Sequence, residues 1–201
     1  MARVDLTEPF AIRTARKAVR ESLQMHGEEI IGLHMYHPVI DQGVERCPNC
    51  YDEDYKQGDP QSCTVCYGTT FNGGIKVMAR MWAMFDDAPN VEEQTKRGVW
   101  QPGDRGIQIE SHPIFMEHDY FFRVKRWSQD HRPLEMGDAF TVDAVTVNSL
   151  RTGNQVAQNT DDVVGQKCRA HQLDVSHIIY KVKGRVISDS FPVDRLDGMP
   201  R

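Results

Sequence analysis

The chain has 201 residues, with 24 Lys and Arg against 29 Asp and Glu, a formal net charge of -5 and 39% apolar residues. This length allows one large domain, or one domain with an inserted module. No stretch approaches the roughly 20 apolar residues of a membrane-spanning helix, no apolar signal segment opens the chain, and the acidic balance argues against general coating of nucleic acid. We therefore expect no membrane association, and the apolar content is modest for a self-sufficient monomer.

The first predicted element is an amphipathic helix within residues 1–30. Pro9 suits the first turn of this helix, and Gly27 suits its end. Apolar side chains recur at helical spacing along one face. The opposite face carries four basic residues, Arg13, Arg16, Lys17 and Arg20. This basic stripe is either a solvated face or a contact for nucleic acid or an acidic partner, and the sequence favours neither alternative.

Four of the five cysteines form two CxxC pairs separated by twelve residues, Cys47, Cys50, Cys63 and Cys66. Each pair makes a tight turn whose two thiolates can bind one metal ion, so the spacing predicts one tetrahedral Zn(Cys)4 site per chain. Four thiolates leave no open coordination position, and we expect a structural zinc ion. The alternative is two disulfides, which need an oxidising compartment. The fifth cysteine, Cys168, is expected to be a small buried side chain.

Residues 47–74 are expected to form an inserted module around this metal. Its loop between the cysteine pairs carries Asp52, Glu53, Asp54 and Asp59. A zinc ribbon that binds phosphates needs basic side chains near the metal. The acidic loop therefore counts against that role.

A segment rich in Ile, Leu, Met, Tyr and Val predicts a strand within residues 30–40. Alternating side chains predict further strands within residues 75–82, 107–110, 120–125, 140–147 and 178–182. A change of phase within 140–147 predicts a β-bulge near Ala144, or a strand buried on both faces. Turn-forming residues at 86–90, 101–104, 136–138 and 151–154 separate the segments. This pattern predicts a mainly β fold, a small antiparallel β-barrel or sandwich made by residues 31–46 and 75–187. The tail, residues 188–201, is expected to be extended or disordered.

The sequence offers no recognisable catalytic motif. Eight histidines are present, but none has the spacing of a metalloprotease motif. His34 and His37 are three residues apart, which would put them on opposite faces of a strand. A nucleophile elbow and a phosphate-binding P-loop are also lacking. We expect no enzymatic activity, and a zinc-stabilised enzyme is the least favoured alternative.

The cysteine module and four later stretches resemble the head-to-tail connector proteins of long-tailed phages of actinobacteria. In the module, the similar residues are the two CxxC pairs followed by Tyr67-Gly68-Thr69, Phe71 and Gly73-Gly74. The later stretches are residues 94–100, 149–154, 162–167 and 173–180. Within this group, the chain most resembles the head-to-tail stopper, also called the head-closure protein.

The resemblance implies a structural virion protein of the phage neck that is assembled in the host cytoplasm. A stopper is a small β-barrel subunit of a ring, expected to be a hexamer, which closes the DNA channel after packaging and docks the tail. Its partners would be other copies of itself, the adaptor ring on the portal, the tail terminator or tail tube, and the passing double-stranded DNA.

Closure in this family is attributed to a loop that projects into the channel. The first candidate is the polar loop 155–162, with Gln155, Gln158, Asn159, Asp161 and Asp162, and the second is 92–100. Two alternatives remain. One is a zinc-ribbon nucleic-acid-binding protein, which would need basic residues around the metal. The other is a different ring of the connector, either the adaptor or the tail terminator, although adaptors are mostly helical.

Overall fold

The computed structural model describes residues 9–55, 57–58, 62–86, 93–95, 98–100, 103–129, 132–150 and 163–182. The first candidate channel loop, 155–162, and the tail, 188–201, lie outside these residues. The second candidate loop is described only at 93–95 and 98–100. Within the described part of the chain, no helix combines the length and the apolar character needed to cross a membrane.

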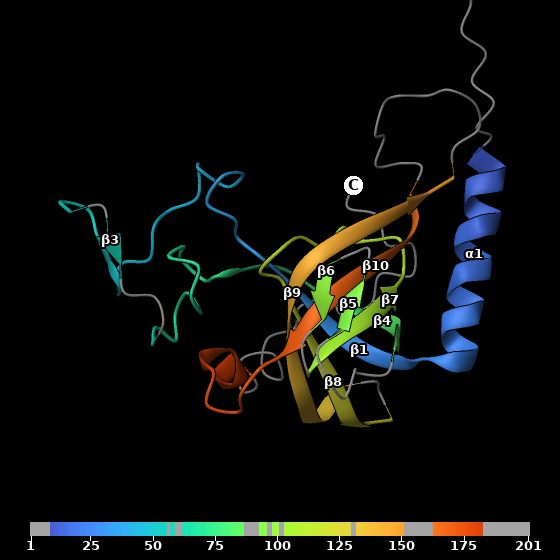
Figure 1. Cartoon of the computed structure of the whole chain (residues 1–201). Coiled ribbons are helices and arrows are strands. Elements are labelled where there is room, and N and C mark those ends of the chain that lie inside the picture. The colour runs from blue at the N-terminus through green and yellow to red at the C-terminus, as the bar shows by residue number, and fades with distance from the viewer. Residues whose placement is uncertain are drawn as a thin grey trace, which may run out of the picture.

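The described residues form one α-helix, a set of antiparallel strands and a short 3-10 helix (Figure 1). The elements are α1 (Pro9–His26), β1 (Glu28–Met35), β2 (Tyr51–Asp52), β3 (Gln57–Gly58), β4 (Ile75–Phe85), β5 (Glu93–Thr95), β6 (Gly98–Trp100), β7 (Asp104–Ile109), β8 (Tyr120–Trp127), β9 (Pro133–Ser149), β10 (Val163–Gln172) and η2 (Ile178–Val182). The predicted mainly β fold with one N-terminal helix is confirmed.

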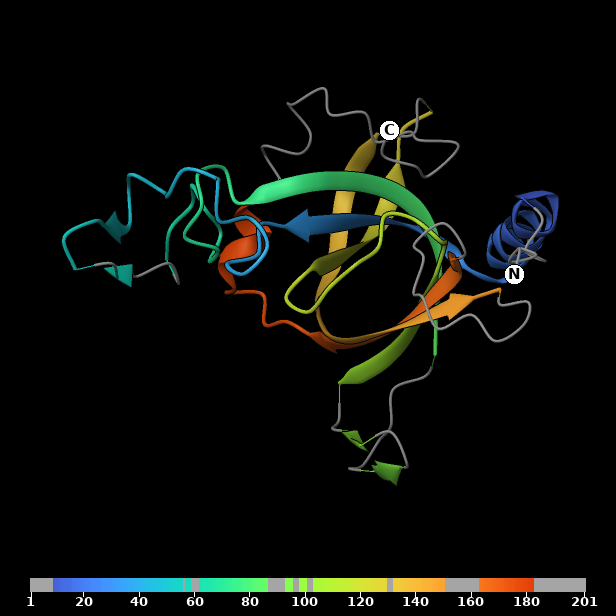
Figure 2. The same ribbon diagram turned by 90° about the horizontal axis from the view of Figure 1, so that it is seen from above.

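Six strands pair in the order β1-β4-β7-β10-β9-β8, and β8 also pairs with β1, so the sheet closes on itself. The chain leaves this sheet after β1 and returns at β4, and these two strands are direct neighbours. The cysteine module occupies the connection between them. Figure 2 shows the module projecting from one side of the sheet and α1 lying on the opposite side.

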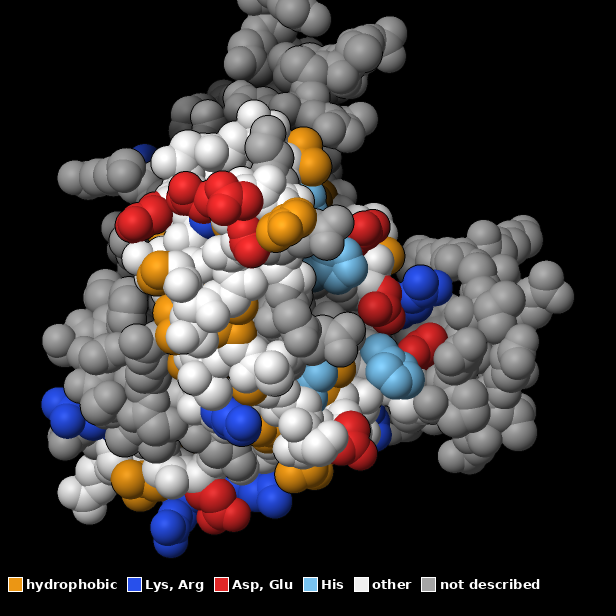
Figure 3. All heavy atoms as spheres, turned by 90° about the vertical axis from the view of Figure 1, so that its left-hand side faces the viewer, with side chains coloured by type: hydrophobic (Ala, Val, Ile, Leu, Met, Phe, Trp, Pro, Cys, Tyr) orange, Lys and Arg blue, Asp and Glu red, His pale blue; other side chains and the backbone are white. Residues whose placement is uncertain are grey.

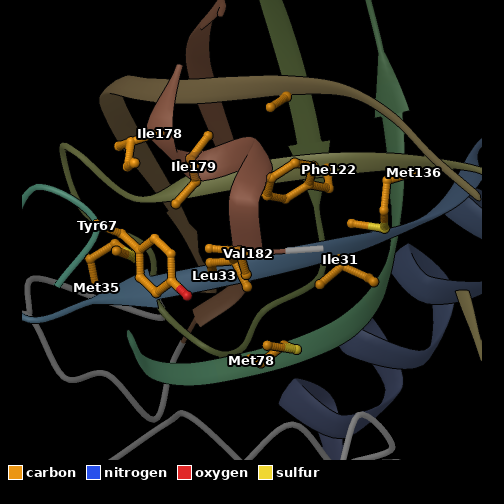
Figure 4. Packing of buried hydrophobic residues seen from close by; sticks show 11 residues of the cluster. Ile31, Leu33, Met35, Tyr67, Met78, Phe122, Met136, Ile178, Ile179 and Val182 are labelled. Carbon is orange, nitrogen blue, oxygen red and sulfur yellow. The ribbon is translucent and has the colours of Figure 1, made fainter. Parts of the chain in front are cut away.

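Two apolar clusters lie on the two faces of this sheet. One includes Ile30, Phe121 and Phe140 and draws residues from all six strands, as the interior of a closed sheet does. The other includes Ile31 and Phe122, the chain neighbours of Ile30 and Phe121. Successive strand residues point to opposite faces, so this second cluster covers the outer face of the sheet. The residues of η2 pack into it (Figure 4).

A loop between β7 and β8 folds back over the interior. Its Phe115 is 1% exposed and packs in the interior cluster. Gln166 of β10 holds this loop in place and is itself buried. Its side-chain oxygen accepts a hydrogen bond from the Phe115 backbone N–H at 2.9 Å, and its amide nitrogen lies 2.7 Å from the Pro113 carbonyl oxygen.

Replacing Gln166 with leucine should therefore destabilise the fold. The leucine side chain has similar volume but leaves the Phe115 N–H and the Pro113 carbonyl buried without a partner. We expect the free energy of unfolding to fall by about 2 kcal/mol or more, measured by urea denaturation. The control Gln172→Leu lies at the exposed end of β10 and should change stability by less than about 0.5 kcal/mol. Equal losses in both variants would refute the bracing role of Gln166.

The β-bulge predicted near Ala144 is confirmed. Arg169 pairs with Ala144, whereas Ala170 pairs with Val142, so one β9 residue is left over in the ladder. Two other predictions are wrong. Residues 178–182 form η2 and not a strand, and the turn predicted at 136–138 lies inside β9. The strand predicted within 30–40 is confirmed, with the bounds Glu28–Met35. Strand β10 was not predicted.

Candidate metal centre

The four predicted cysteines meet at one point of the module. One sulfur atom from each of Cys47, Cys50, Cys63 and Cys66 lies within 4.8 Å of all the others. The Sγ atoms of Cys47 and Cys63 are 3.8 Å apart, and those of Cys50 and Cys66 are 3.4 Å apart. A tetrahedron with metal–sulfur bonds of about 2.3 Å has edges of about 3.8 Å, whereas a disulfide bond is about 2.05 Å. All four are free thiols, and their spacing fits a tetrahedral metal ion.

Each CxxC pair is shaped by a backbone turn. The Tyr51 N–H donates to the Cys47 carbonyl and the Tyr67 N–H donates to the Cys63 carbonyl, both at 3.0 Å. The chain leaves the second turn through Tyr67 and Gly68, whose φ angles are 50° and 97°. Glycine adopts such angles without strain, which explains its position directly after this turn.

Hydrogen-bond donors surround the sulfur atoms. Burial raises the pKa of the Cys63 thiol, but the Asn49 side chain and the backbone N–H groups of Cys66 and Val65 outweigh it and lower this pKa to about 6. Burial raises the pKa of Cys66, and it also raises the pKa of Cys50 with help from the neighbouring sulfurs. Deprotonation of Cys50 and Cys66 therefore calls for a cation, because a bound metal stabilises thiolates directly. The donor set thus has the chemistry of a metal centre.

Apolar contacts attach the module to the sheet. Tyr67 is 2% exposed and packs against Met35 and Ile179 in the outer cluster (Figure 4). Phe71 packs against Tyr36, the residue after β1, with the two ring centres 6.0 Å apart. Tyr67 therefore directly follows the second cysteine pair in the chain and also connects the module to the sheet.

The far part of the module is acidic and exposed. Asp52, Glu53, Asp54 and Tyr55 are all exposed, and the Asp52 carboxylate accepts hydrogen bonds from the backbone N–H groups of Asp54 and Tyr55. Figure 3 views the molecule from the side on which the module projects and shows acidic side chains gathered there. Asp59, the fourth acidic residue predicted in this loop, lies outside the described residues.

The predicted basic stripe of α1 is divided between the protein body and solvent. Arg16 donates to the Val163 carbonyl at 2.7 Å, and the Arg20 guanidinium lies 3.8 Å from Glu110. Arg13 is exposed, and Lys17 is exposed beside Glu21. Of the four basic residues, only Arg13 and Lys17 therefore lie on the exposed surface of the helix, where the sequence predicted all four.

Cys168 is a buried core residue. Its side chain is 1% exposed, and burial, with a contribution from the Asp119 charge, raises its pKa to about 12. It lies outside the cluster that the other four cysteines form.

Sequence reasoning missed one polar pair. His34 and Asp119 lie 2.7 Å apart, between the imidazole Nδ1 and a carboxylate oxygen. The two residues are 85 positions apart in the chain, so no local spacing could reveal them. The pair lies at the edge of a cavity that the cysteine module shares with the sheet.

Comparison of the chain with protein-family models finds no match. Comparison with curated protein sequences finds none either.

Proposed function

We propose that this protein is a structural, zinc-stabilised subunit of a head-to-tail connector, most specifically the stopper ring of a phage neck. The observation that carries the proposal is the gathered set of four free thiols in a module inserted between two neighbouring strands of a closed antiparallel sheet. The proposal also depends on the sequence resemblance, whose stretches are spread between residue 47 and residue 180.

Zinc is the metal that best suits this donor set. Zn²⁺ takes four cysteine thiolates in tetrahedral geometry and has no redox chemistry of its own. The ion would supply binding free energy that becomes folding free energy for the module. Cys47, Cys50, Cys63 and Cys66 would hold it, and the closed sulfur shell leaves no position for a substrate.

The surface of the module favours a structural role over a nucleic-acid-binding one. Asp52, Glu53 and Asp54 are exposed close to the cysteines in the chain, and carboxylates repel phosphates. A conduit for DNA needs a surface that does not hold the passing duplex. The net charge of -5 fits this need.

The proposal is tested by searching for the chain in the particles of the phage that encodes it. Mass spectrometry of purified particles should detect the chain, and an electron-microscopy reconstruction should place it as a ring between the adaptor and the tail terminator. Absence from the particles, or a position in another ring, would contradict the stopper assignment. The zinc site can be tested separately on the purified chain.

A further inference from the structure

A cavity of about 290 Å³ lies where the cysteine module meets the sheet. Three segments line it: residues 34–38 at the end of β1, residues 67–69 after the second cysteine pair, and residues 116–120 at the start of β8. Its volume is close to the lower limit of small-ligand pockets, about 300 Å³. The cavity can therefore take one side chain or a small organic molecule.

The lining of this cavity carries two carboxylates and three imidazoles, those of His34, His37 and His118. Asp119 and Glu117 are both lining residues, and the described residues that line the cavity include no lysine or arginine. Asp119 is 2% exposed. Its carboxylate accepts hydrogen bonds from the Met35 and Met116 backbone N–H groups at 2.8 and 2.7 Å. Among the described residues, its only ion-pair partner is His34.

The charge of Asp119 acts on its surroundings. The pKa of Tyr120 is raised, first by burial and then by the Asp119 charge, and Cys168 shows the same two causes. Lys76, which lies outside the lining, is paired with Asp41 at 2.7 Å. The two carboxylates of the cavity therefore have no lysine or arginine partner within its described lining.

One imidazole and three aromatic rings of the lining can contribute to binding. The Nδ1 of His34 contacts the Asp119 carboxylate and must carry the proton of that bond, which leaves Nε2 as an acceptor when the ring is neutral. Tyr36, Tyr67 and Tyr120 also line the cavity. Tyrosine rings attract cations through their faces.

We propose that this cavity binds an organic cation, either a guanidinium or a primary ammonium group. Carboxylates and tyrosine rings together recognise such a group, and a guanidinium adds planar hydrogen-bond donors that suit carboxylate oxygens. The cation can belong to a free small molecule or to an arginine or lysine side chain of a partner protein. This inference does not depend on the proposed phage function.

The test is an NMR titration of the full, zinc-loaded chain at pH 8 with N-acetyl-arginine methylamide and N-acetyl-lysine methylamide. At least one should give saturable shifts of amide signals from residues 34–38, 67–69 and 116–120. The matched neutral probe, N-acetyl-citrulline methylamide, should give none at the same concentration. Absence of saturable shifts with both cations, or equal shifts with citrulline, would overturn the proposal.

Variants localise the binding. Glu117→Gln should weaken it by about threefold, the effect of losing one exposed ion pair, and Asp119→Asn should weaken it further. Glu53→Gln removes the same charge from the module surface outside the cavity and should leave binding unchanged. Zinc content and amide spectra would show that each variant is folded, and unchanged binding in both folded cavity variants would refute the site.

A peptide separates the two sources of the cation. A pentapeptide with one central arginine should bind at least as well as the arginine derivative if the cavity serves a partner's side chain. Exclusion of the peptide while the small derivative binds would assign the cavity to a free small cation.

Discussion

Replacing Cys63 with serine is expected to reduce the zinc content from about one ion per chain to nearly none. A hydroxyl is a poor substitute for a thiolate, and the loss of one of four ligands opens the sulfur shell. Zinc binding contributes about 10–16 kcal/mol in small zinc domains, so the module should unfold when the ion is lost. Elemental analysis measures the zinc, and hydrogen exchange of the amides in residues 47–52 and 63–70 measures the unfolding.

Cys168→Ala is the matched control for this experiment. Cys168 is buried among apolar residues and lies outside the metal-binding cluster, so the variant should keep its zinc while losing about 1 kcal/mol of stability through a small cavity. Full zinc content in Cys63→Ser would contradict the site. The isolation of a folded wild-type chain without metal, with its cysteines oxidised, would also contradict it.

Replacing Tyr67 with alanine is expected to lower the stability of the fold without changing the zinc content of the module. The Tyr67 ring is buried against the outer face of the sheet and against η2. Truncation of such a large buried aromatic side chain should cost about 3–5 kcal/mol. The zinc content should stay near one ion per chain, because the side chain supplies no ligand. Chemical denaturation and elemental analysis measure the two quantities.

Tyr55→Ala is the control for this variant, since the Tyr55 side chain is 77% exposed on the same module. Its effect should stay within about 0.5 kcal/mol. If Tyr67→Ala were as mild as Tyr55→Ala, the ring would not attach the module to the sheet. If Tyr67→Ala lost its zinc while the sheet stayed folded, the metal site would depend on this contact.

The metal-binding residues could be predicted from the sequence because their signal is local. Each pair of thiols is set by one backbone turn, and the twelve-residue interval brings the second pair to the first. The positions of Cys47 and Cys63 therefore follow from the chain itself, with little help from the rest of the fold. The contact of Tyr67 with η2 joins distant segments and leaves no such local signal.

The strands were predictable where their buried side chains are large and apolar. Strand β10 was missed because three of its buried residues, Gln166, Cys168 and Ala170, are small or polar. Cys168 and Ala170 fit a crowded interior, and Gln166 forms the hydrogen bonds to the loop of Phe115. Together they do not give the alternation of large apolar and polar residues that predicts a strand.

The opposite error occurred at η2, whose alternating Ile178, Tyr180 and Val182 indicated a strand. In the structure, Ile178, Ile179 and Val182 are all buried. This i, i+1, i+4 pattern belongs to a short helical turn covering a sheet and not to a strand with one buried face. The turn predicted at residues 136–138 was wrong for a similar reason, because a glycine inside a long strand gives the same local signal as a turn.

Asp119 shows why the cavity could not be predicted. Its partners, His34 and the Met35 backbone, lie more than 80 positions earlier in the chain and meet it only because β8 pairs with β1. The pairing of these strands depends on closure of the whole sheet. A polar site formed in this way is visible only once the fold is known.

X-ray absorption at the zinc edge of the purified full chain tests directly whether the four cysteines hold one structural zinc ion in a closed shell, as we propose. We expect four sulfur neighbours at about 2.3 Å and no oxygen or nitrogen neighbour. A first shell containing water, or a folded chain whose zinc is absent or bound elsewhere, would contradict this proposal.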